Sequence, residues 1–463
     1  MRHKIRTIHF IGIGGAGMSG IAEVLLNLGY AVTGSDLSNN ASVQRLHELG
    51  ALVYLGHHYD HVRQADLVVY SSAIDESNPE MVAARAANIP VMPRAQMLAE
   101  LMRLKSGIAI AGTHGKTTTT SLIAFILAKA GLDPTYVIGG RLLSAFGGAK
   151  LGSGLYLVAE ADESDGSFLH LAPLVAVVTN IDADHMATYD HDIQNLRQAF
   201  LDFSHRIPFY GMAVLCADCA NIQLVLPSMT KPYVTYGFSS LAHYRAEGIA
   251  QQGRTMHFIA HRPELPPLSV HLNLAGIHNV QNALAAIAVA TELEIPDEAI
   301  IAGLADFSGV ARRFECYGDF PIAGGFFTLI DDYGHHPTEI AATLAAARAT
   351  YPGHRIILAF QPHRFSRTRD LFEEFVKTLA RADLLLLAEI YAAGEAPIPN
   401  IDSRSLAKAL SAYGMQAIVT KDPDEIRNAI LALVQPGDVV VLQGAGSIGT
   451  VAPMIKAHFG EPQ

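Results

Sequence analysis

The chain has few cysteines and no excess of basic residues. Its only thiols are Cys216, Cys219 and Cys316, and the pair Cys216 and Cys219 lacks the second pair that a four-ligand zinc site needs. Lys and Arg number 33 against 44 Asp and Glu, which gives a formal net charge of −11. This acidity argues against nucleic acid or an anionic membrane as a partner. Any anionic substrate must therefore be held by local cationic clusters.

Long apolar runs are missing as well. Basic residues at positions 2, 4 and 6 precede an apolar stretch, but glycines between 12 and 20 interrupt it, so no signal peptide is expected. Nowhere does an uninterrupted apolar run reach the roughly 18 residues of a membrane-spanning helix. The sequence therefore predicts a cytoplasmic enzyme with no membrane partner.

What the chain does have is length and a regular alternation of strand-like and helical segments. With 463 residues, of which 50% are hydrophobic, it is too long for one core and suits about three domains. The alternation repeats three times, which is typical of α/β domains with largely parallel sheets. We expect these domains over residues 1–105, 106–311 and 312–463.

The expected elements follow from the apolar patterns. In the first domain we expect strands over 5–11, 31–33, 67–70 and 91–92 and a helix over 18–28. In the second we expect strands over 108–111, 156–159 and 175–179 and helices over 119–130, 196–203 and 279–293, with only short extended pieces in the Pro- and Gly-containing stretch 230–275. In the third we expect strands over 327–330, 355–360, 384–388, 417–420 and 439–442.

The most informative motif is Gly-Thr-His-Gly-Lys-Thr-Thr over residues 112–118, between an expected strand and an expected helix. In such a turn the backbone N–H groups face a phosphate, the lysine reaches the terminal phosphates and the threonine hydroxyl binds Mg²⁺. The usual motif has its first glycine where this chain has Ile110, so the loop is short. The motif predicts ATP or GTP chemistry, and the alternative is a tight turn with a surface lysine.

A second glycine turn covers residues 12–17 and matches G-x-G-x-x-G after a strand. Asp36 lies about where an acid that binds a ribose is found, so the motif alone indicates NAD and a Rossmann-like domain. Only about 100 residues separate Gly12 from Gly112, which is short for the six-stranded dinucleotide fold. A smaller nucleotide moiety is therefore favoured.

A similar turn over 444–449 has too little chain after it for a ribose acid, so a structural role is favoured there.

Two acidic loops follow strands of the central domain. Residues 160–165 read Glu-Ala-Asp-Glu-Ser-Asp, and residues 179–185 read Thr-Asn-Ile-Asp-Ala-Asp-His. The carboxyl ends of parallel strands meet at one edge of the sheet, where carboxylates are natural Mg²⁺ ligands or bases. The alternative is a pair of solvated acidic loops.

The strongest cationic clusters are Arg-Arg-Phe over 312–314 and Gln-Pro-His-Arg-Phe-Ser-Arg-Thr-Arg over 361–369. Guanidinium groups suit carboxylate and phosphate oxygens, and the alternative is a set of surface arginines without a ligand. Asp-Asp-Tyr-Gly-His-His-Pro over 331–337 contains adjacent histidines, which point apart on an extended segment, so a metal site is not favoured there.

As a set, these motifs resemble those of the Mur ligase family, and within it the branch that adds L-alanine. They run in family order over nearly the whole chain. The segments that carry the resemblance are 8–18, 111–119, 160–165, His278 with Asn279 and Asn282, 312–314, 331–337 and 363–369.

The resemblance implies an N-terminal domain that binds UDP-N-acetylmuramate, a central P-loop ATPase domain, and a Rossmann-like C-terminal domain that brings L-alanine. By carry-over, the sugar nucleotide would contact Gly14, Gly15, Ala16, Gly17, Asp36, Ser71 and Arg94. ATP would contact Gly112, Thr113, His114, Gly115, Lys116, Thr117, Thr118, Asn279, Asn282, Arg313 and Asp332. L-Alanine would contact Tyr333, Arg364 and Arg367. Thr117, Glu160 and His185 would support Mg²⁺, and Lys116, Glu160 and His185 would be catalytic.

The implied reaction belongs to peptidoglycan precursor synthesis. ATP converts the lactyl carboxylate into an acyl phosphate, which the amine of L-alanine attacks after losing a proton to His185 or a carboxylate. Several relatives use a carbamylated lysine after the metal histidine, but this chain has no Lys between His185 and Lys231. That absence is consistent with the L-alanine branch and leaves open whether Arg197 substitutes.

The motifs leave three alternatives open. A ligase of the same family could add a preformed tripeptide, a nicotinamide oxidoreductase would explain residues 12–36 but not Lys116, and a nucleotide sensor would bind without turnover. The chain is expected to act as a monomer or homodimer on small molecules.

Overall fold

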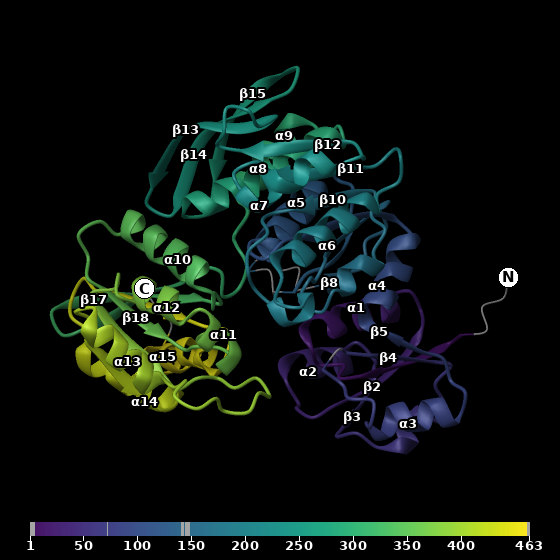
Figure 1. The fold of residues 1–463 in the computed structure, drawn as a ribbon, viewed down its shortest axis with the longest axis horizontal. Helices are drawn as coiled ribbons and strands as arrows, with labels where there is room; N and C mark the ends of the chain where they lie inside the picture. The colour runs from purple at the N-terminus through teal and green to yellow at the C-terminus, as the bar shows by residue number, and fades with distance from the viewer. Residues whose placement is uncertain (1–4, 72, 140–142, 144–148, 461–463) are drawn as a thin grey trace. The chain divides into compact units, whose positions relative to one another are not determined.

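A computed structural model describes residues 5–71, 73–139, 143 and 149–460 as three sheets flanked by helices (Figure 1). Most strand pairs are parallel, which confirms the expected α/β class. The backbone forms two compact units. The first is Met1–Gly248, Phe258–Val270 and Gln281–Ser308, and the second is Ile249–His257, His271–Val280 and Gly309–Gln463. Within the described ranges, no helix combines the length and apolarity that crossing a bilayer requires.

The first sheet has the strand order β3-β2-β1-β4-β5, and all its pairs are parallel. Because β1 lies between β2 and β4, the chain order reverses beside β1, and the turn after β1 opens at this switch point. The strands are β1 (Thr7–Ile11), β2 (Ala31–Asp36), β3 (Leu52–Leu55), β4 (Leu67–Tyr70) and β5 (Val91–Pro93). The helices are α1 (Ala16–Asn27), α2 (Ala41–Glu48), α3 (Pro79–Ala86) and α4 (Arg94–Arg103).

The second sheet has ten strands in the order β15-β14-β13-β12-β11-β10-β6-β9-β7-β8. The strands are β6 (Ser106–Ala111), β7 (Thr135–Val137), β8 (Ala149–Lys150), β9 (Tyr156–Glu160), β10 (Val175–Val178), β11 (Met212–Cys216), β12 (Tyr233–Gly237), β13 (Tyr244–Gln252), β14 (Thr255–Arg262) and β15 (Leu265–Leu272). The helices are α5 (Lys116–Lys129), α6 (Ile193–His205), α7 (Ala220–Val225), α8 (Ile277–Glu292) and α9 (Asp297–Asp306). Strand β6 pairs in parallel with both β9 and β10, so the loops after all three strands emerge at one edge.

The stretch 230–275 is extended, as the sequence predicts, but most of its pieces are longer than expected. It contains β12, of five residues, and then β13, β14 and β15, which have nine, eight and eight residues. In β15 every second residue from Leu268 to Leu272 is buried, which is the pattern of a half-buried strand. Two prolines in β15 hid this pattern, and they are tolerated because β15 lies at the edge of the sheet.

The helix predicted over 119–130 begins earlier, at Lys116. Residues 117–127 of α5 are buried, including its threonines. Thr120 and Ser121 donate their hydroxyls to the carbonyl oxygens of Lys116 and Thr117, at 2.8 and 2.7 Å. These bonds satisfy the polar side chains inside a buried helix. The helix can therefore begin at Lys116 although a run of threonines follows.

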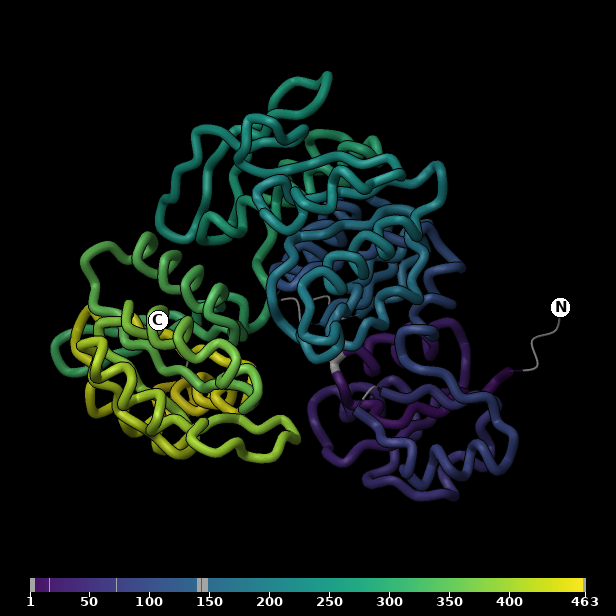
Figure 2. The backbone as a smooth tube through the Cα atoms, viewed as in Figure 1, coloured from purple at the N-terminus to yellow at the C-terminus, as the bar shows by residue number. Residues whose placement is uncertain are grey.

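The third sheet has the order β16-β17-β21-β18-β19-β20, and only its edge strand β16 is antiparallel. Its chain can be followed from green to yellow in Figure 2. The strands are β16 (Glu315–Ile322), β17 (Gly325–Asp332), β18 (Ile356–Phe360), β19 (Leu384–Ala388), β20 (Ala417–Thr420) and β21 (Val439–Gln443). The helices are α10 (Pro337–Thr350), α11 (Phe365–Asp370), α12 (Phe372–Leu379), α13 (Ser403–Ala412), α14 (Pro423–Leu433) and α15 (Val451–Phe459).

Both faces of the third sheet are buried. In β18, Ile356, Leu358 and Phe360 pack with residues of α10, α12 and α13, whereas Ile357 and Ala359 pack with residues of α14 and α15. A strand covered on both faces shows a continuous apolar run rather than an alternation. This explains why the run 355–360 was visible in the sequence.

A buried glutamate joins three elements of the first sheet. The Glu80 carboxylate, in α3, is fully buried and accepts hydrogen bonds from the Ser35 hydroxyl at 2.5 Å and the His58 backbone N–H at 3.2 Å. His61 Nδ1 lies 2.6 Å and His9 Nε2 3.5 Å from its oxygens. Burial alone would raise the pKa of Glu80, but the bonds from His9, Ser35 and His61 outweigh it and lower the pKa to about 2.

We expect Glu80→Gln to lower the free energy of unfolding by about 3 kcal/mol, because it removes the charge around which buried polar partners are arranged. The folded-state pKa is depressed, so the stabilisation is present above the ordinary value of 4.5 and is lost as the pH falls toward about 2. Denaturant unfolding at neutral and acidic pH should show a shallower acid loss in the variant than in the wild type.

Glu76→Gln is the matched control. Glu76 is exposed and pairs with Arg85 on the surface, so its loss should leave the unfolding midpoint almost unchanged. Equal effects of the two substitutions would contradict the structural importance of Glu80.

Candidate functional site

The loop over residues 112–115 leaves strand β6 and enters helix α5. Gly112 has φ +126° and Gly115 has φ +84°, a region that side chains rarely adopt. A Cβ on Gly112 would overlap Thr179 Oγ1, and one on Gly115 would lie 2.5 Å from Asn282 Oδ1. Both glycines are therefore required by conformation and by close approach.

The loop is held by the segment that follows β10. Asn180 accepts the His114 N–H at 2.8 Å with Oδ1 and donates Nδ2 to the His114 carbonyl oxygen at 2.9 Å. The Thr179 hydroxyl donates to the same carbonyl at 2.6 Å. Thr113 Oγ1 accepts the Asp182 N–H at 2.9 Å, and the Thr113 N–H donates to the Asn180 carbonyl at 3.2 Å. Together these bonds fix the loop backbone.

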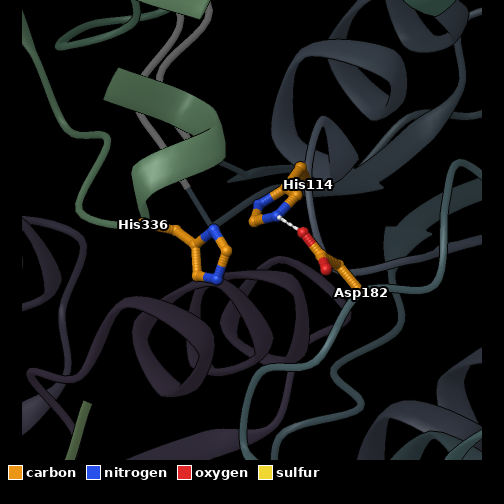
Figure 3. Close-up of side chains that lie close together, drawn as sticks. All are labelled: His114, Asp182 and His336. Atoms are coloured by element: carbon orange, nitrogen blue, oxygen red, sulfur yellow. Dashed lines mark hydrogen bonds and ion pairs between the residues drawn. The ribbon is translucent and has the colours of Figure 1, made fainter. Parts of the chain in front are cut away.

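His114 also faces Asp182 through its side chain. Its Nε2 lies 3.1 Å from Asp182 Oδ2, and Figure 3 shows the imidazole turned toward that carboxylate. This pair adds a side-chain contact to the backbone bonds between the two segments. His114, which the resemblance assigns to ATP, therefore has a structural partner of its own.

Lys116 is the first residue of α5, and its side chain folds back over the loop. Its Nζ donates to the Gly112 and Thr113 carbonyl oxygens at 2.5 and 3.2 Å and lies 2.9 Å from Glu163 Oε1. Burial lowers the pKa of Lys116, but Glu163 and Asp162 outweigh it, so the pKa is raised. For Glu163 the effect of burial is larger and raises its pKa.

The acidic loop after β9 lies beside the phosphate loop. Glu160 is paired in register with Ile110 of β6, so it stands at the carboxyl end of that strand. Its Oε1 accepts the Gly139 N–H at 2.8 Å. In the sequence, Glu163 stands out only as part of the acidic motif, whereas in the structure it pairs directly with Lys116.

His185 and Arg197 lie on the other acidic segment and the helix after it. His185 has φ +54° and its Nε2 lies 3.6 Å from Asp184 Oδ2. Arg197 donates two hydrogen bonds to Asn221 Oδ1, at 2.9 and 2.7 Å, and Asn221 donates to the Ile181 carbonyl at 2.7 Å. A guanidinium has no free lone pair for a metal, so Arg197 acts here by holding the segment around Ile181.

The remaining residues assigned to ATP divide between the two units. Thr117 and Thr118 are buried on the first turn of α5. Asn282 accepts the Thr119 hydroxyl at 3.3 Å, close to the loop at Gly115. Asn279 belongs to the second unit, where its Nδ2 donates to the Ala275 carbonyl at 2.7 Å.

The residues assigned to the sugar nucleotide cluster at the switch point of the first sheet. The Gly14 N–H donates to Asp36 Oδ2 at 2.8 Å, so this carboxylate closes the turn that also contains Gly15. Ser71 follows β4, and a Cβ on Gly12 would lie 3.5 Å from its Cβ. Ala16 is the first residue of α1.

Arg94, at the start of α4, connects this turn with the acidic loop. A Cβ on Gly17 would lie 2.8 Å from Arg94 Nη1, and Arg94 Nη2 lies 3.3 Å from Asp162 Oδ2. Burial raises the pKa of Asp162, but Lys116 and Arg94 outweigh it and lower the pKa. Removing the charge of either Lys116 or Arg94 would therefore raise the pKa of Asp162.

In the second unit, Asp332 and Arg312 order the end of β17. Asp332 accepts backbone N–H groups from Phe314 and Gly334, both at 2.8 Å. Arg312 donates to Asp331 at 3.0 Å and to the Gly444 carbonyl at 2.6 Å. Burial raises the pKa of Asp331 to about 6, although Arg312 opposes it. The guanidinium of Arg312 also lies close to the turn over 444–449, where a Cβ on Gly449 would displace it.

The residues assigned to L-alanine follow β17 and β18. The guanidinium carbons of Arg312 and Arg313 lie 5.2 and 5.3 Å from the centre of the Tyr333 ring. Arg364 has φ +72°, and its buried Nε has no hydrogen-bond partner among the described residues. Arg367 is nearly buried and donates to the His363 carbonyl at 3.3 Å. His336 caps α10 by accepting the Thr338 N–H.

Three family models match the chain. They are described as the Mur ligase family catalytic domain over residues 7–106, the Mur ligase middle domain over 110–290, and the Mur ligase glutamate ligase domain over 312–446. The models together account for most of the chain.

Several known proteins are similar over their full length. The UDP-N-acetylmuramate–L-alanine ligase of Ralstonia nicotianae is 59% identical, with 100% of this chain and 97% of the relative covered. That of Methylobacillus flagellatus is 58% identical, with 98% and 97% covered. The solved UDP-N-acetylmuramate–alanine ligase of Thermotoga maritima is 28% identical with a TM-score of 0.84, and 98% of this chain and 99% of that chain are covered.

These relatives are ligases, which leaves the nicotinamide interpretation of residues 12–36 without support. ATP use follows from the family. On the three matched family models and the full-length identity, this chain belongs to the Mur ligase family.

Proposed function

We propose that this enzyme joins L-alanine to the lactyl carboxylate of UDP-N-acetylmuramate at the expense of ATP. The products are UDP-N-acetylmuramoyl-L-alanine, ADP and phosphate, as a step of peptidoglycan precursor synthesis in the cytoplasm. The observation that carries this proposal is the 59% identity over the whole chain to ligases of that name. We assign the sugar nucleotide to residues 1–105, ATP to 106–311 and L-alanine to 312–463.

The phosphate loop supports the ATP assignment. Its backbone is fixed by bonds within the protein, since Asn180 and Thr179 hold the His114 carbonyl and N–H groups. A preorganised loop loses little conformational freedom when it binds a phosphate. Lys116 would then neutralise charge on the transferring phosphoryl group while the carboxylate oxygen of the sugar attacks it.

Mg²⁺ fits the donors at this edge of the sheet. Thr117 offers a hydroxyl, Glu160 a carboxylate and His185 an imidazole, and Mg²⁺ prefers oxygen ligands. Glu160 stands at the end of β9, beside β6, where such an ion would meet the nucleotide phosphates. When bound, the ion would stabilise negative charge on the phosphate oxygens.

The second unit supports the assignment of the amino acid. The buried Arg364 Nε lacks a partner among the described residues, and a guanidinium donor of this kind suits a carboxylate. Its positive φ is a strained conformation for a non-glycine residue, which is typical of functional sites. We propose that Arg364 and Arg367 bind the L-alanine carboxylate and that Tyr333 lines the same site. His185 or a carboxylate of the acidic loop would take the proton from the amine.

ADP release tests the proposed reaction. With ATP and UDP-N-acetylmuramate present, L-alanine should stimulate release far more than other amino acids. The tripeptide L-alanyl-γ-D-glutamyl-diaminopimelate should not compete. Preferential use of the tripeptide would replace the proposal by the tripeptide ligase, and nucleotide binding without turnover would replace it by a sensor.

Lys116→Ala should abolish acyl phosphate formation while leaving sugar nucleotide binding nearly intact, because the lysine belongs to the loop assigned to ATP and not to the turn assigned to the sugar nucleotide. We expect ADP release to fall by about a thousandfold or more. Binding of UDP-N-acetylmuramate by calorimetry is the control. Substantial ligation by this variant would overturn the assigned role.

Arg364→Lys should raise the KM for L-alanine by about tenfold or more, because a lysine cannot reproduce the guanidinium fork. The KM for ATP should stay close to that of the wild type. Arg369→Lys is the control, since Arg369 is a surface residue that pairs with Asp370. A rise in both KM values would argue for a general disturbance instead.

A further inference from the structure

Every donor of the Lys116 ammonium already has an acceptor. An ammonium has three N–H groups. The acceptors are the carbonyl oxygens of Gly112 and Thr113, at 2.5 and 3.2 Å, and Glu163 Oε1, at 2.9 Å. A phosphate oxygen can bind Lys116 only if one of these three acceptors gives way.

The two carbonyl groups belong to a fixed backbone. The Thr113 N–H donates to the Asn180 carbonyl, and its hydroxyl accepts the Asp182 N–H. Gly112 is confined by Thr179, whose hydroxyl a Cβ would overlap. Moving either carbonyl would therefore break the bonds that shape the loop.

Glu163 is different because only its side chain must move. Its main chain is anchored, since its carbonyl oxygen accepts the Tyr189 hydroxyl at 2.5 Å and the Gly166 N–H at 3.1 Å. Lys116 is the only other residue that the structure pairs with its carboxylate within the described part of the chain, and the buried Oε2 has no hydrogen-bond partner there. The side chain is only 4% exposed. Glu163 is thus the acceptor that a phosphate can replace with the least structural change.

We propose that Glu163 is a positioning residue that holds the Lys116 ammonium over the empty loop and yields it to a phosphate oxygen of the nucleotide. This inference rests on the proposed ATP site. Glu163 keeps the lysine charge compensated and in place between turnovers. Glu163 also competes with the nucleotide for Lys116. The ion pair between Glu163 and Lys116 must break when a phosphate binds, and the carboxylate then lies near a polyphosphate that is also negatively charged.

Only a ligand that carries phosphate groups would compete with Glu163 for Lys116. Comparing ligands with and without phosphates therefore tests the inference. Calorimetry is carried out on the full chain with Mg²⁺ and either ATP, ADP or adenosine, without the other substrates. In Glu163→Gln, ATP and ADP should bind at least about fivefold more tightly than in the wild type. Adenosine lacks phosphates, so its affinity should not change. In the assay of ADP release, the KM for ATP should fall while kcat should not rise.

Asp165→Asn is the matched control. Asp165 is an exposed carboxylate of the same loop and accepts the Ser167 N–H at 2.9 Å, so the substitution removes the same charge at a site that does not touch Lys116. It should change ATP affinity far less. Glu163→Asp keeps the negative charge, but its side chain is one methylene shorter, so the carboxylate lies farther from Lys116. The affinity of this variant for ATP should lie between those of the wild type and the Gln variant. If the Gln variant does not fold, the Asp variant carries the test.

Unchanged or weaker ATP binding by the Glu163 variants would overturn the inference. An equal gain for adenosine would do the same, because it would show a general change in the site. Failure of the wild type to bind ATP at all would instead overturn the proposed function.

Discussion

The site depends on the hydrogen bonds that join the segment after β10 to the loop after β6. Thr179, Asn180 and Asp182 reach the backbone of residues 113 and 114 through side chains and main chain alike. These bonds hold Gly112 and Gly115 in their positive-φ conformations. The conformation of the loop in turn places Lys116 within hydrogen-bond distance of its acceptors. Because β6 and β10 are neighbours in register, the sheet itself sets the distance between the two segments.

Buried charges in this protein are compensated by partners from distant parts of the sequence. Glu80 is surrounded by groups from β1, β2 and the segment after β3, and Lys116 is paired with a glutamate 47 residues away. A charge of this kind is stable only if its partners are in place, so each pair links the correct folding of several elements.

The sequence was sufficient for the regular elements and insufficient for the partners. Strands β4, β19 and β20 were predicted to the residue, because each is a short apolar run bounded by polar residues. The glycine loop and its lysine were found from their spacing. The pairing of Glu163 with Lys116 and the bonds of Asn180 could not be, because side-chain partners across a sheet edge depend on register and rotamer. The assignments of individual residues to substrates stay predictions.

Arg94 has a consequence for any attempt to divide the enzyme into fragments. Its guanidinium lies against Gly17 of α1 and close to Asp162 of the loop after β9, although the polypeptide between the first and second sheets offers an obvious place to cut. A fragment that ends near residue 105 would keep the arginine and lose the acid, leaving an uncompensated cation beside the turn that we assign to the sugar nucleotide. Ligand affinities measured on such a fragment would overstate the attraction for anions.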